Sequence, residues 1–224
     1  ATRQGRDLVF RLDPDPRVKA WIGRTGPINA LSIAGRRRDG KPWVMFSFYG
    51  GGHGACIDGD GLNHGNAPIS TATIPPLEIL EAAYPILFRQ WALRPDSAGA
   101  GEYRGGVGAI YEIEVLEEAG AEAFLFGERG RHPPRGIAGG GNAALNVFSW
   151  EHDGERATPP LHSKMRGIRL RQGEAVRLET PGGGGHGEAR ARDPAAVAAD
   201  VRRGLVSETR ADACHGRDWR SVAS

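Results

Sequence analysis

Residues 109–116 read Ala-Ile-Tyr-Glu-Ile-Glu-Val-Leu, and their alternation is the strongest indication of the fold class. Tyr111, Ile113 and Val115 share one face of an extended chain, while the glutamates between them share the other. Such a two-residue period is typical of a β-strand that packs one face against a hydrophobic core. We therefore expect a protein built mainly from β-strands.

The sequence on both sides of this stretch predicts more strands. Asp39-Gly40 is a strong hairpin-turn dipeptide between two apolar segments, 30–33 and 43–49. Near the start of the chain, residues 8–13 alternate in the same way. Further strands are expected at 86–93, 123–126, 146–150, 168–170 and 175–179.

Helical spacing occurs in two places. Residues 77–84 place their leucines on one face, and Pro85 ends this short helix. The tail of the chain carries the second pattern. Asp193 can cap a helix, Pro194 suits its first position, and three apolar residues recur every four positions: Val197, Val201 and Leu205.

These elements predict an α+β fold that is mainly β, with long Gly-rich loops and a C-terminal helix. We divide the chain into residues 1–188, which hold the strands, and 189–224, the helical tail. Glycine supplies 34 of the 224 residues, roughly twice its usual share. It has no collagen period and clusters in four loops, at 50–75, 94–106, 127–142 and 180–188.

Composition narrows the possible partners and compartment. A net charge of +2 gives no field that would gather nucleic acid, and no apolar stretch approaches the roughly 20 residues that span a bilayer. The two cysteines, Cys56 and Cys214, are too few for a disulfide scaffold, which favours a reduced, cytoplasmic protein. Cys214 is expected in a polar tail after the last helix. The chain starts at Ala1 without Met, so we expect it to begin mid-protein.

The loop at 50–66 is the strongest candidate site. Glycines such as Gly51 and Gly52 allow a backbone to approach a ligand closely. His53 and His64 can transfer protons near pH 7, so we expect them to be catalytic. Together with Asp58 and Asp60 they could also bind a divalent metal, but no recognised ligand spacing is met and the metal residues stay unknown. Substrate contact is therefore favoured over metal binding.

Two further loops offer residues for substrate binding. Asp96 and Arg104 lie in the loop at 94–106, and Arg131 lies in the loop at 127–142. An arginine can grip a carboxylate or phosphate with two parallel hydrogen bonds. The alternative is that Asp96 and an arginine of its loop pair internally and stabilise it. We retain both interpretations.

The chain shows no nucleotide-binding loop. Residues 35–41 run from Gly35 to Lys41 as a phosphate loop would, but Pro42 follows where Ser or Thr would hold magnesium. The segment also joins two strands, whereas a phosphate loop opens a helix. Cys56 near His53 gives only weak support for nucleophilic catalysis, because adjacency in sequence is not spatial geometry.

Five motifs, taken in order, resemble the hydantoinase B / 5-oxoprolinase family between about residues 43 and 188. They are Gly-Gly-Gly-His-Gly-Ala at 50–55 followed by Asp-Gly-x-Gly, Glu-x-x-Glu-x-x-Tyr-Pro at 78–85, Arg-Pro-Asp-Ser-x-Gly-x-Gly-x-x-Arg-Gly-Gly at 94–106, Pro-Pro-x-Gly-x-x-Gly-Gly at 133–140, and Thr-Pro-Gly-Gly-Gly-Gly at 180–185. One such motif could arise by chance, whereas five in order hardly could.

The resemblance implies the C-terminal part of a B-type subunit of an ATP-dependent hydrolase acting on hydantoin, 5-oxoproline or a similar lactam. It implies a hydantoinase A-like partner that binds ATP and Mg²⁺, and a small-molecule substrate. In families of this type the metal-binding His and Asp residues lie in the N-terminal half of the B subunit, which this chain lacks. Acetone and acetophenone carboxylases look similar, so a carboxylase subunit is one alternative. A non-catalytic scaffold and a free-standing binding module are others.

Overall fold

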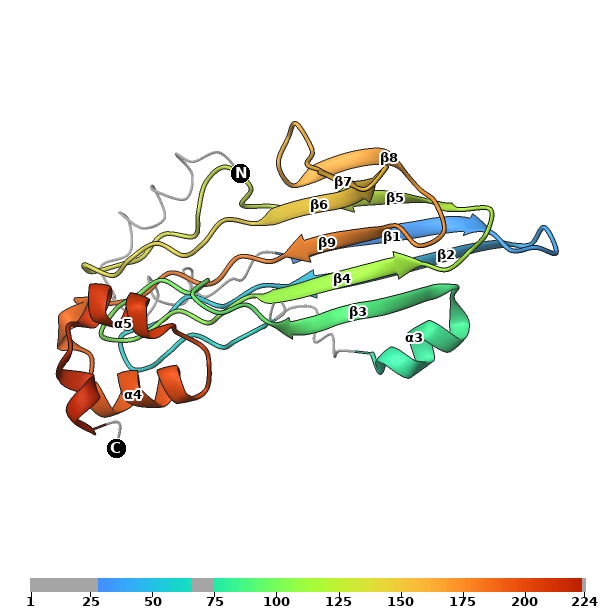
Figure 1. Cartoon of the computed structure of the whole chain (residues 1–224). Helices are drawn as coiled ribbons and strands as arrows, with labels where there is room; N and C mark the ends of the chain where they lie inside the picture. The colour runs from blue at the N-terminus through green and yellow to red at the C-terminus, as the bar shows by residue number, and fades with distance from the viewer. Residues whose placement is uncertain (1–27, 66–74, 223–224) are drawn as a thin grey trace.

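A computed structural model describes residues 28–65 and 75–222. It shows two antiparallel β-sheets stacked face to face, as Figure 1 shows. The first sheet has the order β2-β1-β5-β8, from Pro42–Gly50, Ile28–Arg36, Ala121–Phe126 and Lys164–Leu170. The second has the order β3-β4-β9-β6-β7, from Ile86–Leu93, Ala109–Val115, Ala175–Glu179, Val147–His152 and Glu155–Ala157. The expectation of a mainly β fold is confirmed.

The alternating stretch behaves as its pattern predicts. It forms β4, in which Tyr111, Ile113 and Val115 are at most 1% exposed while Glu112 and Glu114 face outward. The inward faces of the two sheets meet in one hydrophobic core, to which eight of the nine strands contribute. The short strand β7 was not expected, and residues 8–13 lie outside the described residues.

The hairpin turn at Asp39-Gly40 is confirmed. Strands β1 and β2 pair from Ile28 opposite Gly50 to Arg36 opposite Pro42. Gly40 has φ +80°, a conformation that glycine adopts without steric cost, and the Asp39 carboxylate accepts a hydrogen bond from the Lys41 N–H at 3.0 Å. The turn chemistry therefore sets the register of the first sheet.

Helix α3, Leu77–Ala83, ends one residue earlier than expected. Tyr84 already has extended dihedral angles, because the ring of the following proline disfavours the helical conformation for the residue before it. The leucines expected on its apolar face, Leu77 and Leu80, pack against the core of the sandwich, and so does Tyr84 directly after the helix.

The tail contains more helix than expected. The Asp193 carboxylate caps α4, Pro194–Arg202, by accepting from the Ala195 N–H at 2.9 Å, which confirms the predicted start. The expectation that the helix runs on through Leu205 is wrong, since Gly204 turns the chain with φ +68°. A second helix, α5, Glu208–His215, follows, so the placement of Cys214 beyond the last helix is also wrong. Short 3-10 turns flank this pair: η1, Ala189–Ala191, and η2, Asp218–Val222.

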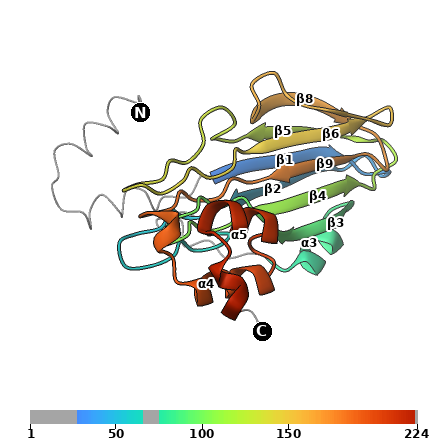
Figure 2. The ribbon, with the colours of Figure 1, turned by 60° about the vertical axis from the view of Figure 1, so that its left-hand side comes forward.

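The tail folds back onto the glycine-rich loops (Figure 2). Buried apolar residues of the tail, among them Val197, Leu205 and Trp219, form a second cluster with Ala98 of the loop at 94–106 and with Val107, which follows that loop. Among the described residues, no helix has the length and apolar character that crossing a membrane requires. The separation into residues 1–188 and 189–224 stays a prediction, and the two parts share this cluster.

Candidate functional site

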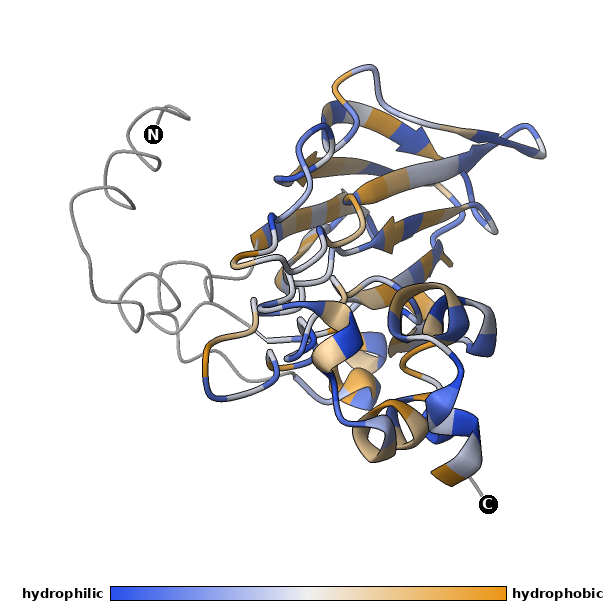
Figure 3. Cartoon of the chain, turned by 90° about the vertical axis from the view of Figure 1, so that its left-hand side faces the viewer, coloured by the Kyte–Doolittle hydropathy of each residue, from blue (hydrophilic) through white to orange (hydrophobic). Residues whose placement is uncertain are grey.

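The glycine-rich loops meet at one end of the sandwich, between the sheets and the tail helices (Figure 3). They are joined by backbone hydrogen bonds between segments far apart in sequence. Gly183 N–H donates to the Gly106 carbonyl at 2.8 Å, Gly99 N–H donates to the Gly183 carbonyl at 2.8 Å, and Gly106 N–H donates to the His53 carbonyl at 2.7 Å. The loops thus form one interlocked unit rather than separate flexible connections.

Glycine is required there because the backbones touch. A Cβ atom on Gly183 would lie 1.8 Å from the His53 carbonyl oxygen, and one on Gly52 would lie 1.9 Å from that of Gly106. Gly51 and Gly52 are themselves buried. We expected these glycines to admit a ligand. The structure instead uses them for backbone-to-backbone packing, so the substrate-binding role of Gly51 and Gly52 stays a prediction.

A buried ion cluster fastens the tail to these loops. The Arg192 guanidinium donates to both carboxylate oxygens of Asp60 at 2.7 Å and to Asp200 at 2.8 Å. Arg104 donates from Nε to Asp200 at 3.1 Å. The side chains of Arg104, Arg192 and Asp200 are each at most 6% exposed. Two arginines and two aspartates therefore balance their charges between the first loop, the second loop and helix α4.

The cluster favours the charged forms of Asp60 and Arg192. Burial alone would raise the pKa of Asp60, but the hydrogen bonds and charge of Arg192 outweigh burial and lower it. Burial likewise opposes the charge of Arg192, while Asp60 and Asp200 raise its pKa. A cavity of about 360 Å³ opens beside the cluster, lined in part by Asp60, Glu102 and Arg192. Because Asp60 already holds two hydrogen bonds from Arg192, the ion pair accounts for it better than a metal does.

His64 lies in an aromatic cluster at the end of the sheets. Its Nε2 accepts a hydrogen bond from the Trp91 indole at 3.2 Å and contacts the Tyr111 hydroxyl. Tyr49 packs edge-on against Tyr111, with ring centroids 4.4 Å apart. Burial lowers the pKa of His64 below 6.5 and raises the pKa of Tyr111. At pH 7 His64 is therefore favoured as the neutral imidazole, and its Nε2 accepts a hydrogen bond from the Trp91 indole.

The lowered pKa of His64 predicts a loss of stability in mild acid. The unfolded chain binds a proton on this residue near pH 6.5, whereas the folded chain resists it. The contribution of neutral His64 to the free energy of unfolding is thus complete above about pH 6.5. It is lost as the pH falls through the lower pKa that His64 has in the folded protein. We expect urea unfolding of the His64→Gln variant to depend less on pH between 7.5 and 5.5 than unfolding of the wild type. The matched control is His152→Gln, an exposed histidine; an unchanged slope in His64→Gln would contradict the prediction.

The other candidate residues are dispersed. The His53 ring lies against Gly65, where an added Cβ would approach Nε2 to 2.6 Å, so His53 and the residue next to His64 are in contact. Asp96 does not pair with Arg104, since its carboxylate accepts from the Ser207 N–H at 2.8 Å and so holds the start of α5. Arg131 is exposed on the third loop. The expected pair of Asp96 with an arginine of its own loop is thus not formed, because Asp96 binds Ser207 and Arg104 binds Asp200. Substrate binding by Asp96, Arg104 and Arg131 stays a prediction.

Metal binding finds no support among the residues that the structure describes. Within them, no three His, Cys, Asp or Glu side chains are grouped closely enough to hold an ion. The Cys56 thiol donates to the Asp58 carboxylate at 2.8 Å, within a tight turn closed by a hydrogen bond from Cys56 N–H to the Gly59 carbonyl. The geometry of this turn accounts for Asp58 without a metal.

With this geometry established, comparison with known proteins places the chain. The sequence profile described as Hydantoinase B/oxoprolinase matches residues 10–189. The chain belongs to the hydantoinase B/oxoprolinase family. It is 39% identical over 136 residues to caprolactamase subunit beta of Pseudomonas jessenii, a match covering 58% of this chain and 23% of that subunit.

Solved structures of this family's relatives share the fold. The crystal structure of the ATP-dependent caprolactamase from Pseudomonas jessenii superimposes with a TM-score of 0.70 and 29% identity, covering 85% of this chain and 35% of that one. Acetone carboxylase gives the same TM-score at 22% identity, covering 84% of this chain and 29% of that one, and shows the fold alone. This chain therefore spans about a third or less of the length of each of these relatives.

Sequence reasoning missed Arg192 and Asp200. One signal was present: Asp200 falls between Val197 and Val201 on the buried face of the tail helix, where a carboxylate requires a partner. The identity of that partner was not accessible, because Arg192 lies outside the helical pattern and Asp60 is 132 residues away from it. The tail of this chain is thus part of the loop architecture.

Proposed function

We propose that this chain is the C-terminal part of a B-type subunit of an ATP-dependent hydrolase of cyclic amides. The supporting observation is its likeness in sequence and fold to the ATP-dependent caprolactamase, over 85% of this chain. The substrate class is a lactam, hydantoin or 5-oxoproline. An A-type partner subunit binds ATP and Mg²⁺ and activates the amide. The N-terminal half of a B-type subunit supplies any divalent metal, and the complex works in the cytoplasm.

Ring opening of an activated cyclic amide requires a water to lose a proton as it attacks the carbonyl carbon. A neutral imidazole can accept that proton near pH 7. We assign this role to His53 or His64, which reach the same corner of the interlocked loops, with Arg131 available to a substrate carboxylate from the exposed third loop. Substrate binding is then shared by further residues of the same loops: Gly51, Gly52, Asp96 and Arg104.

The test is the partner dependence of ATP hydrolysis. The chain alone should show no lactam-dependent ATPase activity, and activity should appear when an A-type subunit and the rest of the B-type subunit are supplied. Caprolactam, hydantoin and 5-oxoproline are tried in turn, with and without bicarbonate. Robust lactam-dependent turnover by the chain alone would refute the proposal. Turnover that requires bicarbonate and a ketone would assign it to the carboxylases instead.

The histidine assignment predicts a large kinetic effect in the assembled enzyme. Replacing His53 or His64 singly by Gln should lower kcat by roughly 100-fold where the residue is the proton acceptor, with little change in KM. His152→Gln, on an exposed strand end, serves as the control and should leave kcat unchanged. If both variants keep full activity while their melting temperatures fall, the two histidines are structural.

A further inference from the structure

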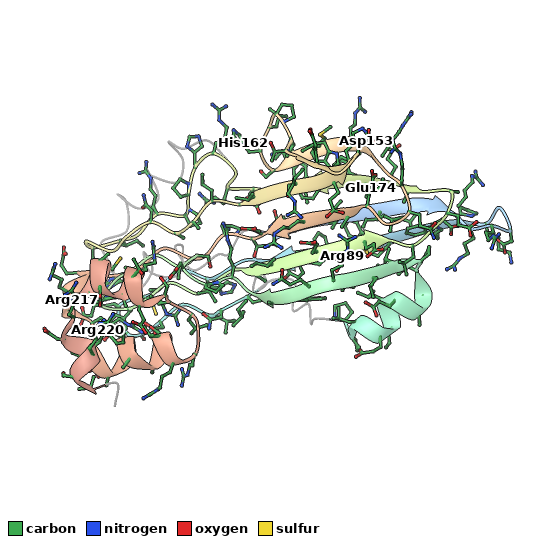
Figure 4. All side chains as sticks on the ribbon, in the orientation of Figure 1. Arg89, Asp153, His162, Glu174, Arg217 and Arg220 are labelled. Atoms are coloured by element: carbon green, nitrogen blue, oxygen red, sulfur yellow. The ribbon has the colours of Figure 1, made fainter. Side chains whose placement is uncertain are left out.

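The two sheets present very different outer surfaces. On the second sheet, Arg89 donates to Glu114 at 2.8 Å and to Glu151 at 3.0 Å, and Arg177 donates to Glu112 at 2.8 Å. Figure 4 shows Arg89 and Glu174 on this surface. Crossed ion pairs of this kind are typical of a sheet face that meets water. The outer face of the second sheet is therefore suited to contact with water.

The outer surface of the first sheet is apolar. Three large side chains project from β2 and two from β5, and each is between 41% and 56% exposed. We call this set the phenylalanine face; it consists of Val44, Phe46, Phe48, Phe124 and Phe126. An antiparallel sheet exposed to water normally alternates apolar-in and polar-out, so a second apolar surface on the same sheet requires an explanation.

The strand register makes the face continuous. Ala30 on β1 lies between Phe48 and Phe126. Two residues further along β1, on the same face of the sheet, Ser32 lies between Phe46 and Phe124. The middle strand thus offers small residues flanked by large ones. The rings of Phe46 and Phe48 also meet edge-on, with centroids 5.0 Å apart. Neighbouring side chains therefore form one patch rather than scattered exposed residues.

Charge is confined to the border of the patch. The Lys164 ammonium on β8 lies 4.5 Å from the centre of the Phe126 ring, and Arg169 lies opposite Glu122 in register. An apolar centre with charges at its rim is the usual anatomy of a protein–protein interface. Five side chains about half exposed amount to roughly 500 Å² of apolar surface, more than half of the ~800 Å² that each partner gives to a standard interface.

We propose that the phenylalanine face is covered by the remainder of a hydantoinase B-type subunit, the part of the relatives' chains that this chain does not match. The match covers 35% of the caprolactamase chain and 29% of the acetone carboxylase chain, so roughly two thirds of each relative lies outside the shared fold. A contact within one subunit buries large apolar side chains permanently, as a domain core does. The proposal rests on the proposed function only for the existence of that remainder, and its test measures stability rather than turnover.

The first experiment uses the 224-residue chain alone. The face should bind an apolar dye such as anilinonaphthalene sulfonate, and the Phe46→Glu/Phe124→Glu variant should lose most of that signal while keeping its melting temperature. Sedimentation should show a monomer. A dimer that the variant dissociates would mean that a second copy covers the face. A variant that unfolds would mean that the chain covers its own face. Either result overturns the proposal.

The second experiment places the chain in a complete subunit, a caprolactamase subunit beta whose matching segment is replaced by the whole 224-residue chain. There, Phe46→Glu/Phe124→Glu should lower the melting temperature by on the order of 10 °C, because two carboxylates would be buried without partners. The matched control is Leu87→Glu/Val147→Glu, which alters the outer surface of the second sheet and should change little. Equal, small effects of both pairs would overturn the proposal. If the hybrid does not fold, hydrogen exchange on an intact subunit of this family decides it: strands aligned with β2 and β5 that exchange as freely as those aligned with β3 and β6 overturn the proposal as well.

Discussion

Replacing Gly183 with Ala should destabilise the protein more than any other single methyl group added to the loops. The new Cβ would lie 1.8 Å from the His53 carbonyl oxygen and 2.5 Å from the Gly54 nitrogen, both of which are backbone atoms that cannot rotate away. The Gly183 N–H and carbonyl also hold Gly106 and Gly99, so a shift of this loop segment breaks hydrogen bonds on two sides. We expect a loss of about 3 kcal/mol or more in the free energy of unfolding, measured in urea.

Alanine substitutions at two other glycines serve as controls, because they show how much of the loss comes from steric clash and how much from replacing any glycine. Gly59 lies in the first loop with no atom within 4 Å of an added Cβ, so Gly59→Ala should be neutral or stabilise by up to about 1 kcal/mol. At Gly141 the nearest atoms are 3.4 Å away, which is ordinary contact, so Gly141→Ala should fall between the two. Equal losses at all three positions would contradict the packing argument.

The interlocked loops also explain how a glycine-rich region can support a site. Each loop is held by backbone bonds to another, for example Ala55 N–H to the Gly184 carbonyl at 2.9 Å. Side chains that leave this unit, such as those of His53 and Arg131, therefore project from a backbone fixed on several sides. A site built on such a backbone loses less conformational entropy on binding than one built on free loops.

The parts of the fold that sequence could predict are local. The alternation at 109–116 and the Asp39-Gly40 turn depend on neighbouring residues, and both were correct. The role of the glycines depends on which loops meet, and that is set by the pairing of strands far apart in the chain. Close approach of the backbone was the right physical reason for their number, and the atoms that the structure shows in close approach belong to other backbone segments.

The buried charges of the tail were likewise only partly predictable from sequence. Spacing correctly predicted the start of α4 at Asp193 and the burial of Val197. It could not show that Arg192, immediately before the cap, turns inward and is 6% exposed. An arginine next to a capping aspartate is expected to be solvated, because burial of a charge is unfavourable without partners. Asp60 and Asp200 supply those partners only after the loop and the helix have docked.

Removing Arg192 should therefore separate the tail from the loops. In Arg192→Met the Asp60 carboxylate loses both side-chain hydrogen bonds at 2.7 Å and keeps the one from the Arg104 backbone N–H, while Asp200 keeps only Arg104. Breaking a buried pair by removing one partner costs about 3–5 kcal/mol, because the remaining charge stays buried without compensation. We expect a loss of that size in urea unfolding, together with faster hydrogen exchange in α4 and α5.

The partners of Arg192 provide the decisive comparison. Arg192→Met/Asp60→Asn should lose less than the sum of its single variants, by about 1–3 kcal/mol, since the two side chains share one interaction. Arg192→Lys retains the charge but cannot bond both Asp60 oxygens in parallel, so it should fall between wild type and Arg192→Met. Arg38→Met breaks an ion pair with Glu118 in which both side chains are more than half exposed, and it should change little because solvent screens that pair. Additive losses in the double variant, or an effect of Arg192→Met no larger than that of Arg38→Met, would show that the tail is held by its apolar contacts with Ala98 and Val107 alone.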